Sequence, residues 1–316
     1  FPLLKITHQA PDVTGNAIGE YLVANCPEIS AFNGVKGFLN ISFSPLYWNE
    51  TLRDIASDGS FGQLPSTGKR IMVEFSSPNT NKPLHLGHIR NNLLGDSVSR
   101  LLKAGGNEVI KSTIVNDRGV HICKSMLAWQ KFFDGKTPES EGVKGDHLVG
   151  DCYVAFDKWY KSEVKELMDK GLTEDEAKKE APSIKAAHQM LVDWEKGDPE
   201  VRALWKKMNG WVYAGFDQTY AALGITFDVV DHESETYILG KELVQKGLDS
   251  GVFQREPDGS VWCDLTADGL DRKLVLRGDG TSVYITQDLG TAERRFANYE
   301  LDSHVYVVGN EQDYHF

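Results

Sequence analysis

Cysteine is scarce in this sequence of 316 residues, and long apolar runs are absent. The chain has four cysteines, far apart and without a Cys-x-x-Cys pair: Cys26, Cys123, Cys152 and Cys263. Neither a zinc knuckle nor a disulfide framework is expected, and buried reduced thiols in a cytoplasmic protein are predicted instead. No run approaches the ~20 apolar residues that span a bilayer, so no membrane partner is expected.

Basic residues are also in short supply. The chain holds 34 Lys and Arg against 46 Asp and Glu, a net charge of −12. A broad positive surface for nucleic acid is therefore excluded, and any such contact must be local. The remaining composition, 41% hydrophobic and 25% charged, is ordinary for a globular protein, and the length suggests about two domains.

The first 67 residues mix two kinds of pattern. An amphipathic helix is expected around 19–24, and alternating apolar residues predict a strand at 38–43. A polar, glycine-rich stretch at 57–69 follows and marks a candidate domain boundary.

The next segment has the pattern of a βαβ unit. A short apolar run at 71–75 predicts a strand, and 108–115 predicts a second one. Between them, 88–103 predicts a helix with apolar residues at helical spacing: Leu93, Leu94, Val98, Leu101 and Leu102. Strand, helix and strand within so few residues favour a parallel sheet, and hence an α/β fold.

Two insertions are predicted after this unit. From about 123 to 194 the pattern is helical, with acidic residues in excess. The tryptophans of this stretch and of its helical continuation are expected in the core: Trp159, Trp194, Trp205 and Trp211. From about 234 to 280, short strands and the turn signal Pro257-Asp258-Gly259 predict a small β-containing insertion. Two later runs, 282–286 and 305–308, are expected to return as strands to the parallel sheet.

The loop between the first strand and its helix carries the most informative residues. His85 and His88 are three apart at the expected helix start, and Gly87 between them lets a ligand approach the backbone closely. A helix N-terminus beyond the carboxyl end of a strand is where open α/β sheets bind phosphate groups. Two imidazoles and free backbone N–H groups suit the stabilisation of a phosphate under in-line attack.

The His-x-Gly-His pattern has competing interpretations. Composition alone predicts about 0.02 accidental matches in the chain. The histidine pair could simply cap the helix or pack against it. A zinc site is disfavoured because no third ligand lies nearby, and no metal site is predicted.

These residues also carry a family resemblance. Pro-Leu-His-Leu-Gly-His at 83–88 resembles the His-Ile-Gly-His signature of class I aminoacyl-tRNA synthetases, and 74–90 as a whole is similar to the arginyl enzymes. The resemblance continues, in order, through Val-Asn-Asp-Arg-Gly at 115–119, Tyr-Ile-Thr-Gln-Asp at 284–288 and Val-Val-Gly-Asn-Glu-Gln-Asp-Tyr-His at 307–315. It implies a Rossmann-like catalytic domain at 68–316, preceded at 1–67 by a partial α+β N-terminal domain that contacts tRNA.

The resemblance also implies roles for individual residues. It places ATP on Pro83, His85, Gly87 and His88, with His85, His88 and Lys82 as the catalytic residues. It places arginine on Glu74, Ser76, Asn79, Tyr284, Asp288 and Gln312. The set makes physical sense, because a guanidinium is always charged and planar and is best recognised by carboxylates beside a flat ring.

Lys82 bears on how the phosphates of ATP would be held. Many class I synthetases hold the ATP phosphates with a Lys-Met-Ser-Lys-Ser loop, which this sequence does not contain. Either Lys82, just upstream of the histidines, takes over the charge-neutralising role, as in arginyl enzymes that lack the loop, or the loop lies beyond residue 316.

The expected function is that of an arginine–tRNA ligase. It would activate L-arginine with ATP and Mg²⁺, without a tightly bound metal of its own, and transfer it to tRNA-Arg as a monomer. A chain that starts at Phe1 and shows no anticodon-binding domain is expected to be a fragment that is weak or inactive alone. Two alternatives remain: an inactive arginine- or tRNA-binding paralogue, and another His-x-Gly-His nucleotidylyltransferase. His121 follows the polar turn at 116–119 and could border the site, although the sequence indicates ligand contact only weakly.

Overall fold

The computed structural model describes residues 3–278, 280, 283–313 and 315. The chain forms two compact units, Phe1–Leu64 and Pro65–Phe316. No helix in the described ranges has both the length and the apolarity needed to cross a membrane.

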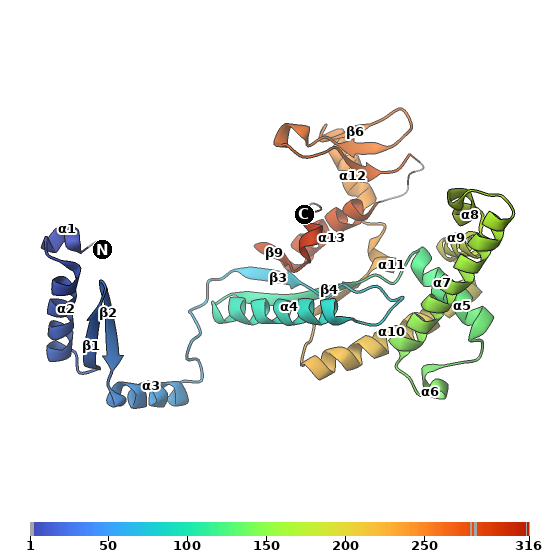
Figure 1. Ribbon diagram of the computed structural model, residues 1–316. Coiled ribbons are helices and arrows are strands. Elements are labelled where there is room, and N and C mark those ends of the chain that lie inside the picture. The colour runs from blue at the N-terminus through green and yellow to red at the C-terminus, as the bar shows by residue number, and fades with distance from the viewer. Residues whose placement is uncertain (1–2, 279, 281–282, 314, 316) are drawn as a thin grey trace. The chain divides into compact units, whose positions relative to one another are not determined.

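The first unit is a helix packed on a hairpin, followed by another helix (Figure 1). Its elements are α1 (Leu4–Thr7), α2 (Pro11–Asn25), β1 (Ile29–Val35), β2 (Phe38–Phe43) and α3 (Pro45–Ser57). The predicted helix and strand of this region are both present. β1 and β2 pair in antiparallel fashion. α2 packs closely on β1 at Gly19, where a Cβ atom would be 2.2 Å from the Phe32 ring and only glycine fits.

A parallel sheet forms the centre of the second unit, in the order β5-β4-β3-β9. Its strands are β3 (Arg70–Glu74), β4 (Glu108–Val115), β5 (Val229–His232) and β9 (Ser303–Tyr306). Met72 and Val73 of β3 are fully buried, as expected for a parallel strand covered on both faces. The predicted α/β fold class is confirmed.

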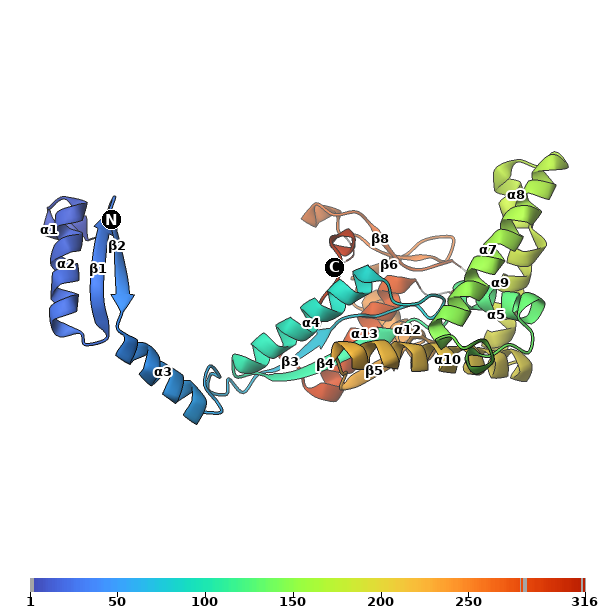
Figure 2. The same ribbon diagram turned by 60° about the horizontal axis from the view of Figure 1, so that its bottom comes forward.

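Helix α4 (Leu86–Ala104) covers one face of this sheet alongside β3 and β4 (Figures 1 and 2). Of the apolar residues at helical spacing, only Val98 and Leu102 pack against the sheet core, whereas Leu93, Leu94 and Leu101 are exposed. The helix face that is buried consists of small or polar residues: Asn92, Gly95, Asp96 and Ser99. Because a Cβ at Gly95 would lie 2.2 Å from the Phe75 ring, close approach rather than apolar bulk seats this helix.

Helices fill the chain between β4 and β5. They are α5 (Val120–Phe132), α6 (Pro138–Glu141), α7 (Gly145–Asp169), α8 (Glu174–Glu180), α9 (Pro182–Lys196) and α10 (Pro199–Leu223). Four of them, α5, α7, α9 and α10, pack together around a common apolar core at one end of the unit (Figure 2). Trp194 is buried as expected, and Cys123 and Cys152 are free, buried thiols whose pKa burial raises to about 12.

After β5 the chain forms a second, small sheet before β9 joins the parallel sheet. Its elements are α11 (Glu233–Thr236), α12 (Gly240–Asp249), β6 (Phe253–Arg255), β7 (Val261–Cys263), η1 (Thr266–Asp268), β8 (Lys273–Leu276), α13 (Tyr284–Tyr299) and, after β9, η2 (Asn310–Gln312). The predicted antiparallel strands are confirmed as the order β6-β7-β8. The strand predicted at 282–286 is wrong, because α13 begins at Tyr284; Ser282 lies outside the described residues.

Candidate active site

The loop after β3 begins with two strained residues. Ser76 and Ser77 have φ angles of 73° and 42°, in the left-handed region that non-glycine residues rarely adopt. Hydrogen bonds hold both of them: the Ser76 N–H donates to Asn91 Oδ1 (2.6 Å) and the Ser77 N–H donates to Thr113 Oγ1 (3.1 Å). Such strain persists only where the surroundings fix it, and it is common at functional sites.

This turn orients Glu74, the last residue of β3. The Ser77 hydroxyl donates to Glu74 Oε1 (2.9 Å), and the guanidinium of Arg295, from α13, pairs with Glu74 Oε2. Further along the loop, Asn79 forms a parallel bridge with Asn116, the residue after β4. The loop therefore extends the β3–β4 pairing past the carboxyl edge of the sheet.

His85 and His88 cap helix α4 reciprocally. The backbone N–H of His85 donates to His88 Nδ1 (3.2 Å), and the N–H of Gly87 donates to His85 Nδ1 (3.1 Å). Because Nδ1 accepts in both rings, the proton of each neutral imidazole must be on Nε2. The ring centroids are 4.0 Å apart, so the site presents two adjacent N–H donors at the positive end of the helix.

The electrostatic setting keeps His88 uncharged. Burial, together with the neighbouring His85 and Lys82, lowers the pKa of His88 to about 4. At neutral pH the ring is thus uncharged, and its Nε2–H group can donate a hydrogen bond to a phosphate oxygen while Nδ1 continues to accept from the backbone.

One cavity of about 1910 Å³ collects most of the predicted site residues. The predicted site residues in its wall are Glu74, Ser76, Asn79, Lys82, His85, Gly87, His88, Asp288 and Gln312. Pro83 is not in its wall; it lies against α7, where a Cβ at Gly150 would be 2.8 Å from Pro83 Cδ. Tyr284 begins α13, but its side chain is outside the described part of the structure.

Asp288 and Gln312 come from the C-terminal part of the chain. Asp288 is on the first turns of α13, and His315 Nε2 lies 2.7 Å from its Oδ2. Burial raises the pKa of Asp288, which means that its negative charge is under-compensated by its surroundings. Gln312 ends η2 and is exposed to the cavity.

Two cavity residues were missed in the sequence. Glu233 is 7% exposed, and burial raises its pKa to about 7 despite the nearby positive charge of Arg118. Arg118 forms an ion pair with Glu195 and lies over the Tyr237 ring at 4.0 Å. Both residues follow strands of the parallel sheet at the carboxyl edge, so the rule applied to the loop after the first strand could have found them.

Asp117, next to Arg118, ties these elements together. It is fully buried and accepts hydrogen bonds from the Tyr213 hydroxyl (2.7 Å) and from the Ser234 N–H (2.8 Å). His232 Nδ1 lies 3.2 Å from the same carboxylate, and this hydrogen bond raises the pKa of the imidazole. One carboxylate thereby fixes the ends of β4 and β5 against α10.

His121 also lines the cavity, as part of its α5 wall. Its Nδ1 is 3.0 Å from the Tyr153 hydroxyl, and burial lowers the pKa of the ring. Contact with a ligand remains a prediction for this residue.

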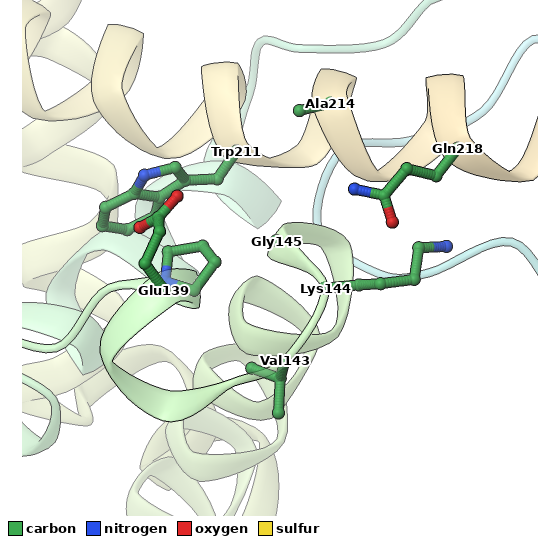
Figure 3. A pocket seen from close by; sticks show the side chains of 8 residues that line it. Glu139, Val143, Lys144, Gly145, Trp211, Ala214 and Gln218 are labelled. Carbon is green, nitrogen blue, oxygen red and sulfur yellow. The ribbon is translucent and has the colours of Figure 1, made fainter.

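A second, smaller cavity of about 250 Å³ lies between α6, the start of α7 and α10 (Figure 3). Its wall includes Glu139, Lys144, Trp211 and Gln218. None of the predicted site residues lines it. Within the described ranges, no cluster of three or more His, Cys, Asp or Glu side chains could hold a metal ion.

The sequence matches a known family and named relatives. The family described as tRNA synthetases class I (R), catalytic domain, matches residues 52–316. An arginine–tRNA ligase of Bacteroides thetaiotaomicron is 59% identical to this chain over 318 residues. The match covers all of this chain and 53% of that protein. The arginine–tRNA ligase of Flavobacterium psychrophilum is 60% identical to this chain over 329 residues, which cover 55% of that protein. The chain thus spans about half the length of these curated relatives.

Solved structures agree on the fold. The arginyl-tRNA synthetase of Thermus thermophilus superposes with a TM-score of 0.59 at 24% identity, over 92% of this chain and 46% of that one. The Plasmodium falciparum arginyl-tRNA synthetase gives a TM-score of 0.61 at 18% identity, over 95% of this chain and 50% of that one.

Proposed function

The chain belongs to the class I tRNA synthetase family, arginyl type, and from this premise we propose that it activates L-arginine with ATP. The product would be arginyl-adenylate, with release of pyrophosphate. A protein that contains this chain would then transfer the arginyl group to the 3′ end of tRNA-Arg.

The observation that carries the proposal is the content of the large cavity. Phosphate-directed groups (Lys82, His85 and His88) and a carboxylate pair suited to a guanidinium (Glu74 and Asp288) line the same space. A site for a nucleotide alone would not need the second set, and a site for arginine alone would not need the first.

The first set fits the attack on ATP. An oxygen of the arginine carboxylate attacks the α-phosphorus, and the bond to the bridging oxygen of the β-phosphate breaks. The Nε2–H groups of His85 and His88 would donate to oxygens of the α-phosphate as its charge develops. Lys82, which lines the cavity and is half-buried, would neutralise the leaving pyrophosphate, and Mg²⁺ would enter with ATP.

The second set fits the side chain of arginine. Asp288 has a raised pKa, so a planar cation beside it would relieve the cost of its burial. Glu74 is held at the cavity wall by Ser77, and Asn79 and Gln312, which line the same cavity, would bind the α-amino end of the amino acid. Ser76 and Tyr284 complete the proposed arginine contacts, and Pro83 and Gly87 the ATP contacts.

Transfer to tRNA would be the second step. A ribose hydroxyl of the 3′-terminal nucleotide attacks the arginyl carbonyl, and AMP leaves. We also propose a monomer in the cytoplasm, with an appended domain at 1–67, a catalytic domain at 68–316 and insertions at about 123–194 and 234–280. The separate packing of residues 1–64 and the positions of the helices and short strands support this division.

Arginine-dependent exchange of pyrophosphate into ATP, measured with and without tRNA, tests the proposal. In a full-length protein that contains this chain, we expect exchange with arginine and none above background with lysine or citrulline. Arginine should also raise the melting temperature of this chain more than lysine or citrulline does. Equal shifts with all three ligands would contradict the arginine pocket.

A further inference from the structure

Arg295 is a charged side chain enclosed by the protein. It lies on α13, is 1% exposed, and its guanidinium sits between β3 and β5. Its Nε and Nη2 donate to Asp231 Oδ2 at 2.9 and 2.8 Å, and its Nη1 pairs with Glu74 Oε2. A buried guanidinium is tolerated only when its donors are matched in this way.

The other neighbours of Arg295 do not compete for the charge. His304 Nε2 is 3.4 Å from Arg295 Nη1, and burial with the adjacent guanidinium lowers the pKa of His304 to about 3, so the imidazole is neutral. Arg294, next in sequence, pairs with the other oxygen of Asp231 and is half-buried. Arg294 bonds to Asp231, whereas Arg295 bonds to both Asp231 and Glu74, so the two neighbouring arginines are chemically alike but differently placed.

Arg295 joins both carboxylates of the proposed arginine site. Glu74 is bonded to it directly, and Asp288 is seven residues earlier on the same helix, hence on the same face two turns away. The salt bridges to β3 and β5 therefore fix where α13 presents Asp288. Glu74 still lines the cavity, and a carboxylate has about four lone-pair positions, so acceptor capacity is left for a second guanidinium.

The charges of this cluster balance. Two carboxylates (Glu74 and Asp231) face two guanidinium groups (Arg294 and Arg295), and Asp288 lies outside this set, with His315 Nε2 2.7 Å from its Oδ2. Without the charge or the fork of Arg295, Glu74 would be free to rotate or take up a proton, and this balance would be lost.

We propose that Arg295 is a positioning residue of the arginine site: by bridging Glu74 and Asp231 it fixes the Glu74 carboxylate and the helix that carries Asp288. The inference rests on the proposed function. It predicts that replacing Arg295 affects arginine much more than ATP, whereas a general loss of structure would affect both ligands.

Calorimetric titration of arginine and of ATP into wild-type, Arg295→Lys and Arg294→Lys chains tests this role. Lysine keeps the charge but lacks the planar fork whose Nε, Nη1 and Nη2 reach both carboxylates, so Arg295→Lys should weaken arginine binding at least tenfold and ATP binding less than twofold. Arg294→Lys, the matched control, should leave both dissociation constants within twofold.

The outcomes separate the two proposals. A wild-type chain that binds ATP but not arginine overturns the proposed function and, with it, the basis of this inference. Normal arginine binding by both the wild-type and the Arg295→Lys chains overturns the positioning role alone. If Arg295→Lys is unfolded by circular dichroism, Asp231→Asn replaces it, because Asp231 anchors Arg295 without lining the cavity. At least threefold weaker arginine binding supports the role, and an unchanged dissociation constant rejects it.

Discussion

His88 combines a structural and a chemical task in one ring. Its Nδ1 accepts the His85 N–H and so helps to begin α4, while its Nε2–H is left for a ligand. Its pKa of about 4 means that the ring keeps this form throughout the physiological pH range. The neutral donor is thus prepared by the fold before any substrate arrives.

Removal of the His88 ring should slow activation. We expect His88→Ala to lower arginine-dependent pyrophosphate exchange more than tenfold, in the chain or in a longer form that contains it, because one phosphate donor is lost. Loss of the cap should cost about 1 kcal/mol of stability, which denaturant unfolding would measure. His147→Ala, in an exposed position of α7, is the control; an exchange rate unchanged by His88→Ala would reject the role.

Glu233 predicts a pH dependence of stability. Its pKa in the folded chain is about 7, above the ordinary 4.5, so the folded state holds the proton more tightly than the unfolded state. The stability from the protonated form is complete below pH 4.5 and is lost as the pH rises through 7, by up to about 3 kcal/mol. Glu233→Gln, which remains neutral, should therefore stabilise the protein at pH 8 but hardly at pH 4.

Urea unfolding of both proteins at pH 4 and pH 8 measures this difference. Glu235→Gln, at an exposed position in the same short helix, is the matched control and should change stability equally at both pH values. A Glu233→Gln effect of the same size at pH 4 and 8 would mean that this carboxyl titrates normally.

Individual site residues were predictable only where a local pattern surrounds them. His85, Gly87 and His88 are close together in the sequence and at a helix start, so their shared position could be inferred directly. The contact between Glu74 and Arg295 joins residues 221 positions apart. No periodicity encodes such a pair, and it became visible only with the packing of α13 on the sheet.

At the scale of elements, α7 supports the loop that carries Lys82 and Pro83. Gly150 of α7 faces this loop, and a Cβ there would be 2.8 Å from Pro83 Cδ and 3.8 Å from Lys82 Cα. The close approach of α7 at this glycine thus helps to set the position of Lys82, the lysine proposed to bind phosphate.

Gly150→Ala should disturb ATP more than arginine. The proline ring is not a flexible side-chain end, so the loop must shift, and we expect the KM for ATP to rise at least threefold with the KM for arginine within twofold. Gly210→Ala, in α10 with nothing within 4 Å of the added Cβ, is the control and should stabilise its helix by about 0.5 to 1 kcal/mol. Parallel increases in both KM values would argue against a loop-specific effect.

The elements themselves differ in how well the sequence predicts them. The bounds of β4 coincide with the predicted strand, because its second half is buried in the sheet and the polar residues Asn116 and Asp117 follow it. The run Ser-Val-Tyr-Ile-Thr at 282–286 has high β-propensity, yet α13 begins within it. There, the buried contacts of Thr286 and Arg295 with the rest of the unit override local preference.

At the scale of the whole molecule, the proposed site belongs to one unit. Every predicted site residue lies between 74 and 312, inside Pro65–Phe316. The two units are joined by residues that are exposed throughout 58–69 and include three glycines.

Limited proteolysis should therefore cut first within 58–69. Mass spectrometry of the products should show a large C-terminal fragment, and this fragment should keep the arginine-dependent rise in melting temperature. Untreated chain carried through the same steps is the control. Primary cuts inside 70–316, or a fragment that no longer responds to arginine, would contradict this division of labour.

The parallel pairing of β3 with β9 sets an order of events during synthesis. The Arg70 N–H donates to Asp302 Oδ2, 232 residues further along the chain. At about 5 to 20 residues per second, a ribosome needs roughly 12 to 46 s to make that stretch. Once β4 has been made, β3 has β4 on one side but keeps an open hydrogen-bonding edge on the other until β9 follows, and another nascent chain could pair there. The segment that follows residue 302 thus both completes the proposed arginine pocket and closes that edge.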